Sequence, residues 1–193
     1  MFRIAVCDDE ARYVQQTANY LQEYLHVHPA LTGQIHTFQR GQELLHQAEI
    51  GGGFDLYLLD IIMPELNGIQ TGQRLRELGQ GGEIIYLTTS SDYAVDSYSV
   101  RAFFYLLKPL EKERLFQVLD AAVEKLNDRR EKAILISTRD APRRVPLDQI
   151  LYVERVGRSL RYYRSHDTLD SLSLRVAFHT AVGPLLSDPR FCQ

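Results

Sequence analysis

Five polar residues of the sequence each come at the end of, or directly after, one of four apolar segments of strand length. They are Asp8, Asp9, Asp60, Thr88 and Lys108. Carboxylates crowded at one place repel each other, which is costly unless a cation lies among them. Oxygen ligands of this kind favour a hard ion such as Mg²⁺. A carboxylate can also accept a phosphoryl group, whose oxygens Mg²⁺ and an ammonium would neutralise. If the five residues converge, they predict Mg²⁺-dependent phosphoryl transfer to a carboxylate.

Their convergence requires a parallel sheet. The first 131 residues alternate between apolar runs and helical patterns, an order typical of a doubly wound α/β domain with five parallel strands. Strands are expected at 2–7, 34–38, 54–59, 84–87 and 102–107, and helices at about 10–26, 41–49, 67–78, 92–99 and 111–130. Parallel strands present their carboxyl ends along one edge of the sheet, where ligands bind. The five residues are therefore expected to meet there, with Asp60 as the phosphoryl acceptor and Asp8 and Asp9 as metal ligands.

Each of these residues taken alone has a plainer interpretation. Asp8 or Asp9 could cap the first helix. Asp60 could be a turn residue, Thr88 a satisfied hydroxyl at a strand end, and Lys108 a solvated surface lysine. The joint placement at the ends of four strands is the feature that favours a site.

The composition indicates a folded chain in a reducing compartment. Of the 193 residues, 45% are hydrophobic and 24% are charged, which is sufficient for a packed core. No apolar run approaches the ~18 residues of a membrane span, and the first residues lack the pattern of a signal peptide. Two cysteines, Cys7 and Cys192, provide no disulfide framework. We therefore expect a cytoplasmic protein that makes no membrane contact.

The charge changes sign along the chain. Residues 1–131 hold 12 Lys+Arg and 19 Asp+Glu, a net charge of −7, whereas residues 132–193 hold 10 and 6, a net charge of +4. The basic part has short β-rich runs at 133–137, 149–156 and 159–164, followed by a short helix at about 175–186. This pattern predicts a second, mostly β module. Its positive charge could face nucleic acid or could be ordinary surface variation.

Three segments of the first part resemble a known family. In order and spacing, Val6–Glu10, Leu59–Pro64 with Gly68, and Tyr105–Pro109 are similar to the receiver domain of response regulators. The resemblance implies that Asp60 accepts phosphate from a sensor histidine kinase, and that Thr88 and Lys108 contact the phosphoryl group. It also implies a cis peptide bond before Pro109 and the following ligands for Mg²⁺: Asp8, Asp9, Asp60 and the backbone carbonyl of Ile62.

The same resemblance implies a conformational switch. Phosphorylation adds roughly −1.5 to −2 charges at Asp60, which would pull Thr88 and Lys108 toward the phosphoryl group. Tyr105 would then rotate inward and the nearby surface would change, usually favouring a homodimer. Phe104 stands where related sequences often carry an acid, and strand alternation predicts that it faces away from the site.

The second part resembles the start of a LytTR-type DNA-binding domain. The segments that carry the resemblance are 145–154 followed by 157–160, 173–174 with the helix after it, and 188–191. That family reads DNA with loops between strands, which implies four candidate DNA contacts: Arg155, Arg158, Arg161 and Arg164. Each arginine could equally lie on a solvated strand face. The resemblance covers less than a complete domain, so unpaired strand edges are expected.

The sequence therefore predicts a receiver domain at 1–125, a linker at 126–131 and a partial LytTR-like domain at 132–193. The leading hypothesis is a response regulator, not an enzyme, whose phosphorylation controls transcription. The alternative is a phosphorylation-dependent protein-binding module that has lost DNA binding through truncation. A Mg²⁺-dependent phosphatase is disfavoured because Ile62 occupies the position, two residues after the acceptor, where such enzymes carry an acid.

Overall fold

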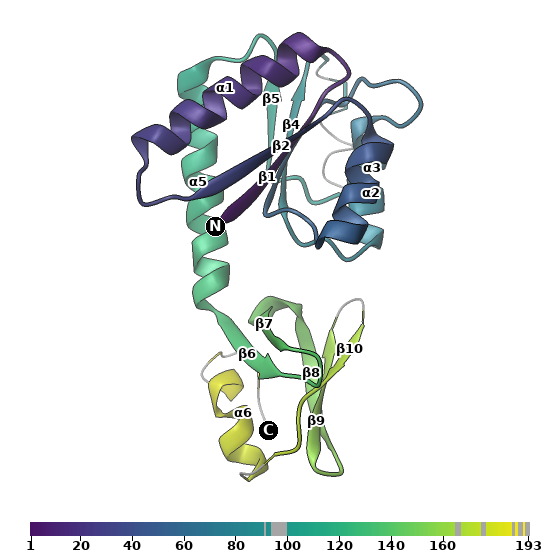
Figure 1. The fold of residues 1–193 in the computed structure, drawn as a ribbon, viewed down its shortest axis with the longest axis vertical. Coiled ribbons are helices and arrows are strands. Elements are labelled where there is room, and N and C mark those ends of the chain that lie inside the picture. Colours follow the sequence, from purple (N-terminus) through teal and green to yellow (C-terminus); the bar gives the residue numbers. More distant parts are fainter. Residues whose placement is uncertain are drawn as a thin grey trace. The chain divides into compact units, whose positions relative to one another are not determined.

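The computed structural model describes residues 1–90, 92–93, 100–164, 167–174, 177–186, 188 and 191. The chain forms two compact units, Met1–Glu124 (the first unit) and Lys125–Gln193 (the second unit). In Figure 1 the first unit runs from purple to teal and the second from green to yellow. The helix predicted at 92–99 lies outside the described residues, apart from Asp92 and Tyr93.

The first unit contains a five-stranded parallel sheet with the strand order β2-β1-β3-β4-β5. The strands are β1 (Phe2–Cys7), β2 (Gly33–Phe38), β3 (Leu56–Leu59), β4 (Glu83–Thr88) and β5 (Phe104–Leu107). The predicted doubly wound α/β fold is thereby confirmed. Its strand order changes direction at β1, so the carboxyl ends of β1 and β3 lie side by side at the point where ligands bind in such sheets.

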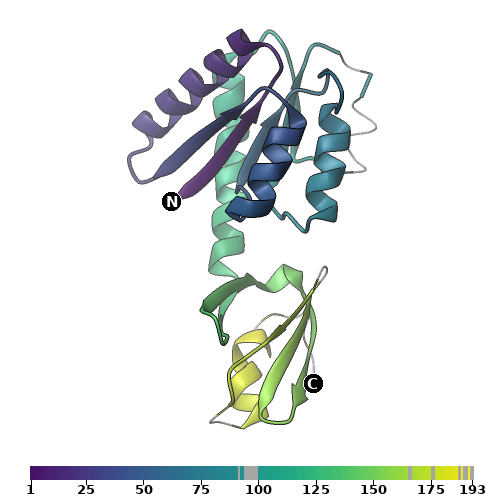
Figure 2. The ribbon, with the colours of Figure 1, turned by 45° about the vertical axis from the view of Figure 1, so that its right-hand side comes forward.

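Helices cover both faces of this sheet. α1 (Ala11–Val27) and α5 (Lys112–Glu131) lie on one face, and α2 (Gly41–Gly51) and α3 (Gly68–Glu77) lie on the other, as Figures 1 and 2 show. The two central strands, β3 and β4, are buried at every position because they are covered from both sides. Leu21, Leu44, Leu75 and Leu115, one from each covering helix, are also fully buried, so both faces of the sheet contribute to the core.

Two predicted strands are shorter in the structure. The runs 54–59 and 102–107 enter the sheet only at Leu56 and Phe104. Phe54 is buried in the core, but its backbone N–H donates to the Tyr57 hydroxyl at 3.0 Å instead of to a neighbouring strand. The apolar run 54–59 thus indicates a buried segment but overstates the length of the strand, whereas in the run 102–107 only Leu106 is buried.

The second unit consists of two small antiparallel sheets and a helix. β6 (Ala133–Ser137) pairs with β7 (Pro142–Pro146), and the other sheet has the order β10-β9-β8. The remaining elements are the 3₁₀ turn η1 (Leu147–Gln149), β8 (Ile150–Val156), β9 (Ser159–Arg164), β10 (Thr168–Asp170) and α6 (Phe178–Leu186). The mostly β second region is thereby confirmed. β7 and β10 were not predicted, because β7 begins and ends with proline and β10 has only three residues.

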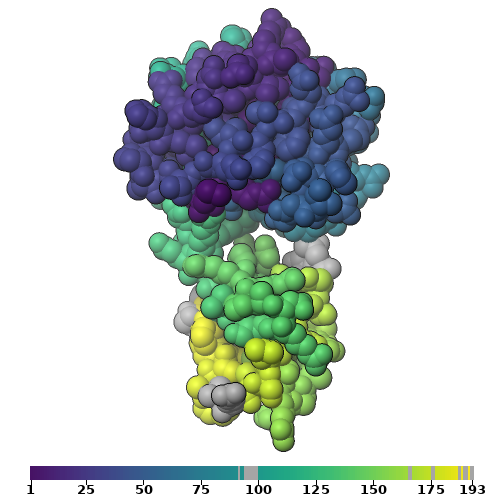
Figure 3. All heavy atoms as spheres, in the orientation of Figure 1, coloured from purple at the N-terminus to yellow at the C-terminus, as the bar shows by residue number. Residues whose placement is uncertain are grey.

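The small core of the second unit lies between its sheets and α6. Its buried side chains are Ile136, Val145, Leu147, Ile150, Leu160, Tyr162, Leu169, Val182 and Leu185. On the face of this unit that Figure 3 shows, the green β6–β7 hairpin and the yellow α6 lie side by side. α6 continues through Pro184 to Leu186, and among the described residues of the chain every helix is too short or too polar to cross a membrane.

Candidate functional site

The five predicted polar residues lie at the carboxyl edge of the sheet of the first unit. Asp8 and Asp9 follow β1, Asp60 follows β3, Thr88 is the last residue of β4, and Lys108 follows β5. These four strands are neighbours in the sheet, so their parallel pairing brings the five residues to one edge.

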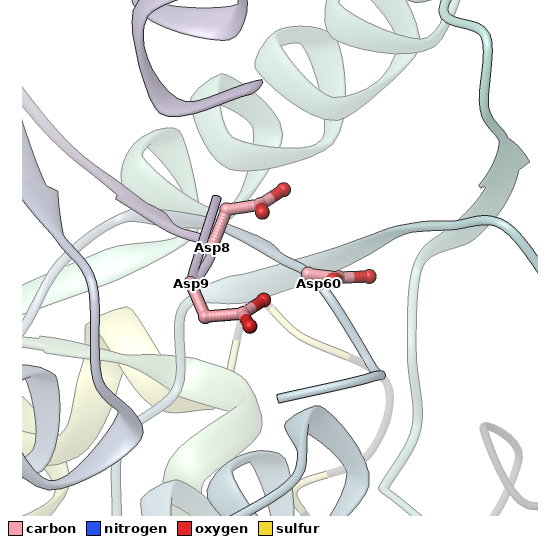
Figure 4. Close-up of side chains that lie close together, drawn as sticks. All are labelled: Asp8, Asp9 and Asp60. Carbon is pink, nitrogen blue, oxygen red and sulfur yellow. The ribbon is translucent and has the colours of Figure 1, made fainter. Parts of the chain in front are cut away.

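Three carboxylates form an acidic cluster at this edge. Asp8, Asp9 and Asp60 each offer an oxygen, and these oxygens lie within 4.8 Å of one another. Figure 4 shows Asp8 and Asp9 next to Asp60, with all three carboxylates directed toward the same side. Asp8 and Asp60 are buried, whereas Asp9 is exposed. The cluster is therefore open to solvent on the side of Asp9.

One ammonium group contacts both buried carboxylates. Lys108 Nζ lies 2.6 Å from Asp8 Oδ2 and 3.3 Å from Asp60 Oδ2. The three side chains are only 2%, 4% and 6% exposed, respectively, so these charges interact with little screening by water. The Lys108-Pro109 peptide bond is cis, and the Lys108 N–H donates to the Thr88 carbonyl at 2.7 Å. β5 thus delivers the ammonium to the site from a position tied to β4.

Burial is the main influence on the pKa of the two buried carboxylates, Asp8 and Asp60. Desolvation raises the pKa of Asp8 and of Asp60, and the nearby Lys108 ammonium opposes that rise only in part. The single positive charge of Lys108 does not balance the negative charge of two buried carboxylates. This electrostatic situation suits the binding of a further cation.

The segment after β3 fixes Asp60. The Ile61 N–H donates to Asp60 Oδ1 at 2.8 Å, and the Asp60 N–H donates to the Cys7 carbonyl at 2.8 Å. Gly68 begins α3 against this segment, and a Cβ at position 68 would lie 2.1 Å from the Asp60 carbonyl oxygen. Only glycine allows this approach. Ile62 lies two residues after Asp60 with its side chain exposed, and its carbonyl as a metal ligand stays a prediction.

Thr88 and Tyr105 both contact Ser90. Thr88 is fully buried, and its hydroxyl accepts the Ser90 N–H at 3.5 Å. The Tyr105 hydroxyl donates to the Ser90 carbonyl, and its ring packs against the core. The next residue back, Phe104, lies against the Arg114 guanidinium, 5.2 Å from ring centroid to Cζ. The two proposed switch residues are therefore joined through Ser90, while their role in switching stays a prediction.

Sequence reasoning missed two residues beside the site. The ring of Tyr13, in the first turns of α1, lies with its centroid 4.0 Å from Lys108 Nζ. Cys7 is buried beneath Asp8, and burial together with nearby carboxylates raises the pKa of its thiol to about 12. An aromatic residue four positions after Asp9 was the available signal for Tyr13, because a helix that starts at the sheet edge brings its first turns near the strand ends.

The four arginines predicted to contact DNA are differently placed in the second unit. Arg161 donates to both carboxylate oxygens of Asp170, at 2.7 and 2.8 Å, and Arg164 pairs with Asp167. Arg155 and Arg158 are exposed beside the β8–β9 turn, where Gly157 has a φ of 62°. Sequence reasoning also missed three exposed arginines of the β6–β7 hairpin: Arg139, Arg143 and Arg144. The last two lie between the two prolines of β7.

The comparison with protein families identifies the class of the first unit. The family model described as "Response regulator receiver domain" matches residues 4–120, which is more than half of the chain. The chain therefore belongs to the response regulator receiver domain family. The matched residues include the whole acidic cluster, Thr88 and Lys108.

The curated relatives are named as regulators of transcription or signalling. The transcriptional regulatory protein CitT of Halalkalibacterium halodurans is 28% identical over 128 residues, covering 65% of this chain and 54% of that protein. The sensory transduction protein LytR of Staphylococcus epidermidis is 31% identical over 102 residues, covering 53% and 40%. The chain thus spans about half the length of the curated relatives it matches.

Solved structures share the fold of the first unit. The response regulatory domain of mrkE from Klebsiella pneumoniae aligns with a TM-score of 0.57 and 21% identity, covering 65% of this chain and 98% of that one. A CheY-like receiver domain protein from Methanospirillum hungatei aligns with a TM-score of 0.58 and 21% identity, covering 66% and 98%. At this identity the likeness shows the fold alone.

Proposed function

We propose that the chain is a two-component response regulator in which Asp60 accepts a phosphoryl group from a sensor histidine kinase. The observation that carries this proposal is the position of the Lys108 ammonium, which lies 2.6 Å from Asp8 and 3.3 Å from Asp60 inside a buried acidic cluster. Membership of the receiver family supports it. Asp60 is the carboxylate at the end of a fully buried central strand.

In the transfer, an oxygen of Asp60 bonds to phosphorus as the bond from phosphorus to the kinase imidazole nitrogen breaks. The leaving imidazole takes up a proton. Positioning and charge stabilisation supply most of the catalysis of such a transfer. The Ile61 N–H holds Oδ1 of the acceptor at 2.8 Å, and Lys108 meets the charge on the phosphoryl oxygens. Thr88 contacts the phosphoryl group from the end of β4.

The residues present fit Mg²⁺. The acidic cluster offers only oxygen ligands, within 4.8 Å of one another, and one carboxylate is exposed, which leaves room for the waters that Mg²⁺ retains. We assign Asp8, Asp9, Asp60 and the backbone carbonyl of Ile62 as the residues that would hold the ion. When bound, Mg²⁺ neutralises part of the charge on the phosphoryl oxygens.

The proposal includes a switch that acts through β4 and β5. The charge added at Asp60 draws Thr88 toward it, and Ser90, which contacts both Thr88 and Tyr105, carries the displacement to the Tyr105 ring. The change in the surface around β5 then favours a homodimer. The switch shifts a balance between two states that exist before phosphorylation.

The output we propose is control of transcription through DNA binding. The curated relatives named as transcriptional regulators support this output, as does the basic, mostly β region after the first unit. We assign residues 1–125 to a receiver domain, 126–131 to a linker and 132–193 to part of a LytTR-like domain. Arg155 and Arg158, exposed beside a turn, are the preferred DNA contacts among the four predicted arginines.

A second candidate function is phosphorylation-dependent protein binding by the second unit. The pairing of Arg161 with Asp170 and of Arg164 with Asp167 favours it, because arginines held by carboxylates meet phosphates less readily. Exposed apolar side chains such as Leu135 and Leu151, which are 69% and 62% exposed, also favour a protein partner.

Intact mass after incubation with acetyl phosphate and Mg²⁺ tests the acceptor. The wild-type chain is expected to gain one phosphoryl group, Asp60→Asn none, and a chelator should abolish labelling. Asp128→Asn provides a matched control, since Asp128 is an exposed acid of α5 paired with Lys132. Equal labelling of the wild type and Asp60→Asn would contradict the assignment of the acceptor.

Selection from a random DNA pool separates the two outputs. Under the DNA-binding proposal, the phosphorylated chain enriches a defined sequence, and Arg158→Ala weakens binding more than Arg161→Ala does. Binding that is weak, indifferent to sequence and equal in both variants would favour the protein-binding function instead.

A further inference from the structure

The ring of Tyr13 lies against the ammonium of the candidate site. Lys108 Nζ is 4.0 Å from the ring centroid, well within the range of a cation–π contact. The Tyr13 side chain is partly buried, and Lys108 is almost completely so. Water is therefore largely excluded from this contact, which strengthens it.

Among the described residues, two carboxylates and one aromatic ring lie next to the ammonium, and they differ in what happens to them during the reaction. Asp8, at 2.6 Å, is among the carboxylates that would hold Mg²⁺, and Asp60, at 3.3 Å, becomes the phosphorylated residue. Both anionic partners of Lys108 thus form other interactions during the reaction, one with the metal and one with the phosphoryl group. The Tyr13 ring is the neighbour that the chemistry leaves unchanged.

A ring also suits a site that must receive an anion. Its face attracts an ammonium through its quadrupole but adds no negative charge that would repel the incoming phosphoryl group. Lysine has a long flexible stem, so a contact that restricts its head group raises the fraction of time it spends in the reactive position.

The Tyr13 ring is itself held by its surroundings. The Arg12 guanidinium lies 4.6 Å from the ring centroid and forms an ion pair with Glu10 at 2.7 Å. The Tyr13 N–H donates to the Glu10 carbonyl at 2.9 Å. The short segment that follows Asp8 and Asp9 therefore also orients the ring.

From this geometry we propose that Tyr13 is a positioning residue for phosphoryl transfer. Its ring face keeps the Lys108 ammonium at the site while Asp8 and Asp60 are engaged by the metal and the phosphoryl group. The inference rests on the function proposed above. It concerns the ring face, so the hydroxyl of Tyr13 is expected to contribute little.

The first test compares rates of phosphorylation by acetyl phosphate. Tyr13→Phe keeps the ring and is expected to react within about twofold of the wild type, whereas Tyr13→Leu should react about threefold to tenfold more slowly. Tyr20→Leu is the matched control. Tyr20 is on the same helix, and its hydroxyl accepts from the Gln16 side chain at 3.3 Å.

A graded series distinguishes the ring's electrostatics from its packing. Phenylalanine at position 13 with increasing numbers of fluorines keeps nearly the same shape while its face becomes less negative. A cation–π role predicts a stepwise fall in rate along this series. A flat series would overturn the role, because packing alone would then account for Tyr13.

A readout without phosphodonor or metal tests the contact itself. The chain has four lysines, and Lys108 is the first of them, so isotope-labelled lysine gives a simple NMR spectrum. The Lys108 side-chain protons nearest the ring should be shifted upfield in the wild type and Tyr13→Phe, and this shift should disappear in Tyr13→Leu. An unchanged shift in Tyr13→Leu would overturn the contact.

The outcomes separate this inference from the proposed function. If the wild type is labelled on Asp60 and Tyr13→Leu reacts at the same rate, the positioning role is wrong while the proposed function stands. If Tyr13→Phe is as slow as Tyr13→Leu, the hydroxyl rather than the ring face is responsible, and the proposal is also wrong. If the wild type is not labelled at all, the proposed function fails and the role of Tyr13 in it fails too.

Discussion

The charged groups of the candidate site in the first unit are mostly buried at one edge of the sheet. The ion pairs of the second unit lie on exposed strands. The Lys108 side chain is 2% exposed beside Asp8, while Arg161 and Asp170 of the second unit are 37% and 53% exposed. Water screens the second pair and leaves the first almost unscreened. Similar ion pairs therefore have different consequences: the charges of the buried pair interact strongly, whereas the exposed pair contributes little to the stability of the fold.

The packing of the two units differs in the same sense. Every residue of β3 and β4 is buried, whereas in β8 only Ile150 is. Exposed large apolar residues of the second unit include Leu135, Leu151 and Tyr152. A strand covered on both faces tolerates little change, and a strand open on one face tolerates much. The predictions below use this difference.

The largest expected effect is on the core of the first unit. Leu58→Ala removes a fully buried side chain from β3 and should destabilise that unit by about 3 kcal/mol. Leu151→Ala, at a position 62% exposed, should change stability by less than about 0.5 kcal/mol. Hydrogen exchange followed by fragment mass analysis reports the two units separately. Equal losses in the two variants would remove the contrast between the units.

The next effect concerns the acidic cluster. Burial raises the pKa of folded Asp60, so the folded state holds its proton to higher pH than the unfolded state does, and stability falls as the pH rises through that interval. Asp60→Asn removes this loss and keeps the Asp8–Lys108 pair at 2.6 Å. The variant should be more stable than the wild type at pH 7.

That gain should disappear below the ordinary aspartate pKa of 3.8, where both states are protonated. Urea unfolding across this pH range measures it. Lower stability of Asp60→Asn at neutral pH would show that the carboxylate stabilises the fold, and would contradict the dominance of desolvation.

Mg²⁺ should stabilise the first unit and not the second, by less than the loss expected for Leu58→Ala. A ligand present at ten times its Kd stabilises the state that binds it by about 1.4 kcal/mol. The first unit should gain this stability in hydrogen exchange, and the second unit should not change. Asp9→Asn is expected to weaken the effect, because Asp9 is the exposed carboxylate of the cluster. Equal protection of both units would indicate nonspecific binding.

The smallest effect is expected at the exposed ion pair of the second unit. Arg161→Ala removes both hydrogen bonds to Asp170, yet exchange protection of β9 and β10 should be unchanged within error at physiological salt. A clear loss of protection would show that this pair organises the three-stranded sheet, and the contrast between the two units would then be weaker.

The sequence predicted the neighbourhood of the site better than the limits of the surrounding elements. Asp8, Asp60, Thr88 and Lys108 lie at the ends of apolar runs, and parallel strands bring such ends together regardless of where each strand begins. The run 54–59 was overestimated, because a buried side chain such as Phe54 does not require strand pairing at its own backbone.

Contacts that depend on tertiary packing could not be predicted in this way. The place of Tyr13 at the start of α1 indicates only that its ring lies near the strand ends. Its contact with Lys108 depends on the direction in which α1 crosses the sheet, and local patterns do not encode that direction. The pairing of Arg161 with Asp170 follows from the register of β9 with β10, a strand too short to be recognised. From the sequence alone, each arginine of β9 could equally contact DNA or lie on a solvated strand face.

The buried thiol of Cys7 is a built-in probe for local opening of the first unit. Its side chain is 1% exposed and its pKa is raised to about 12, so the folded chain presents neither access nor thiolate to an alkylating reagent. Cys7 can react only during an opening of the strand that ends at the acidic cluster. In a Cys192→Ser background, the rate at which Cys7 is alkylated therefore reports how often this strand opens.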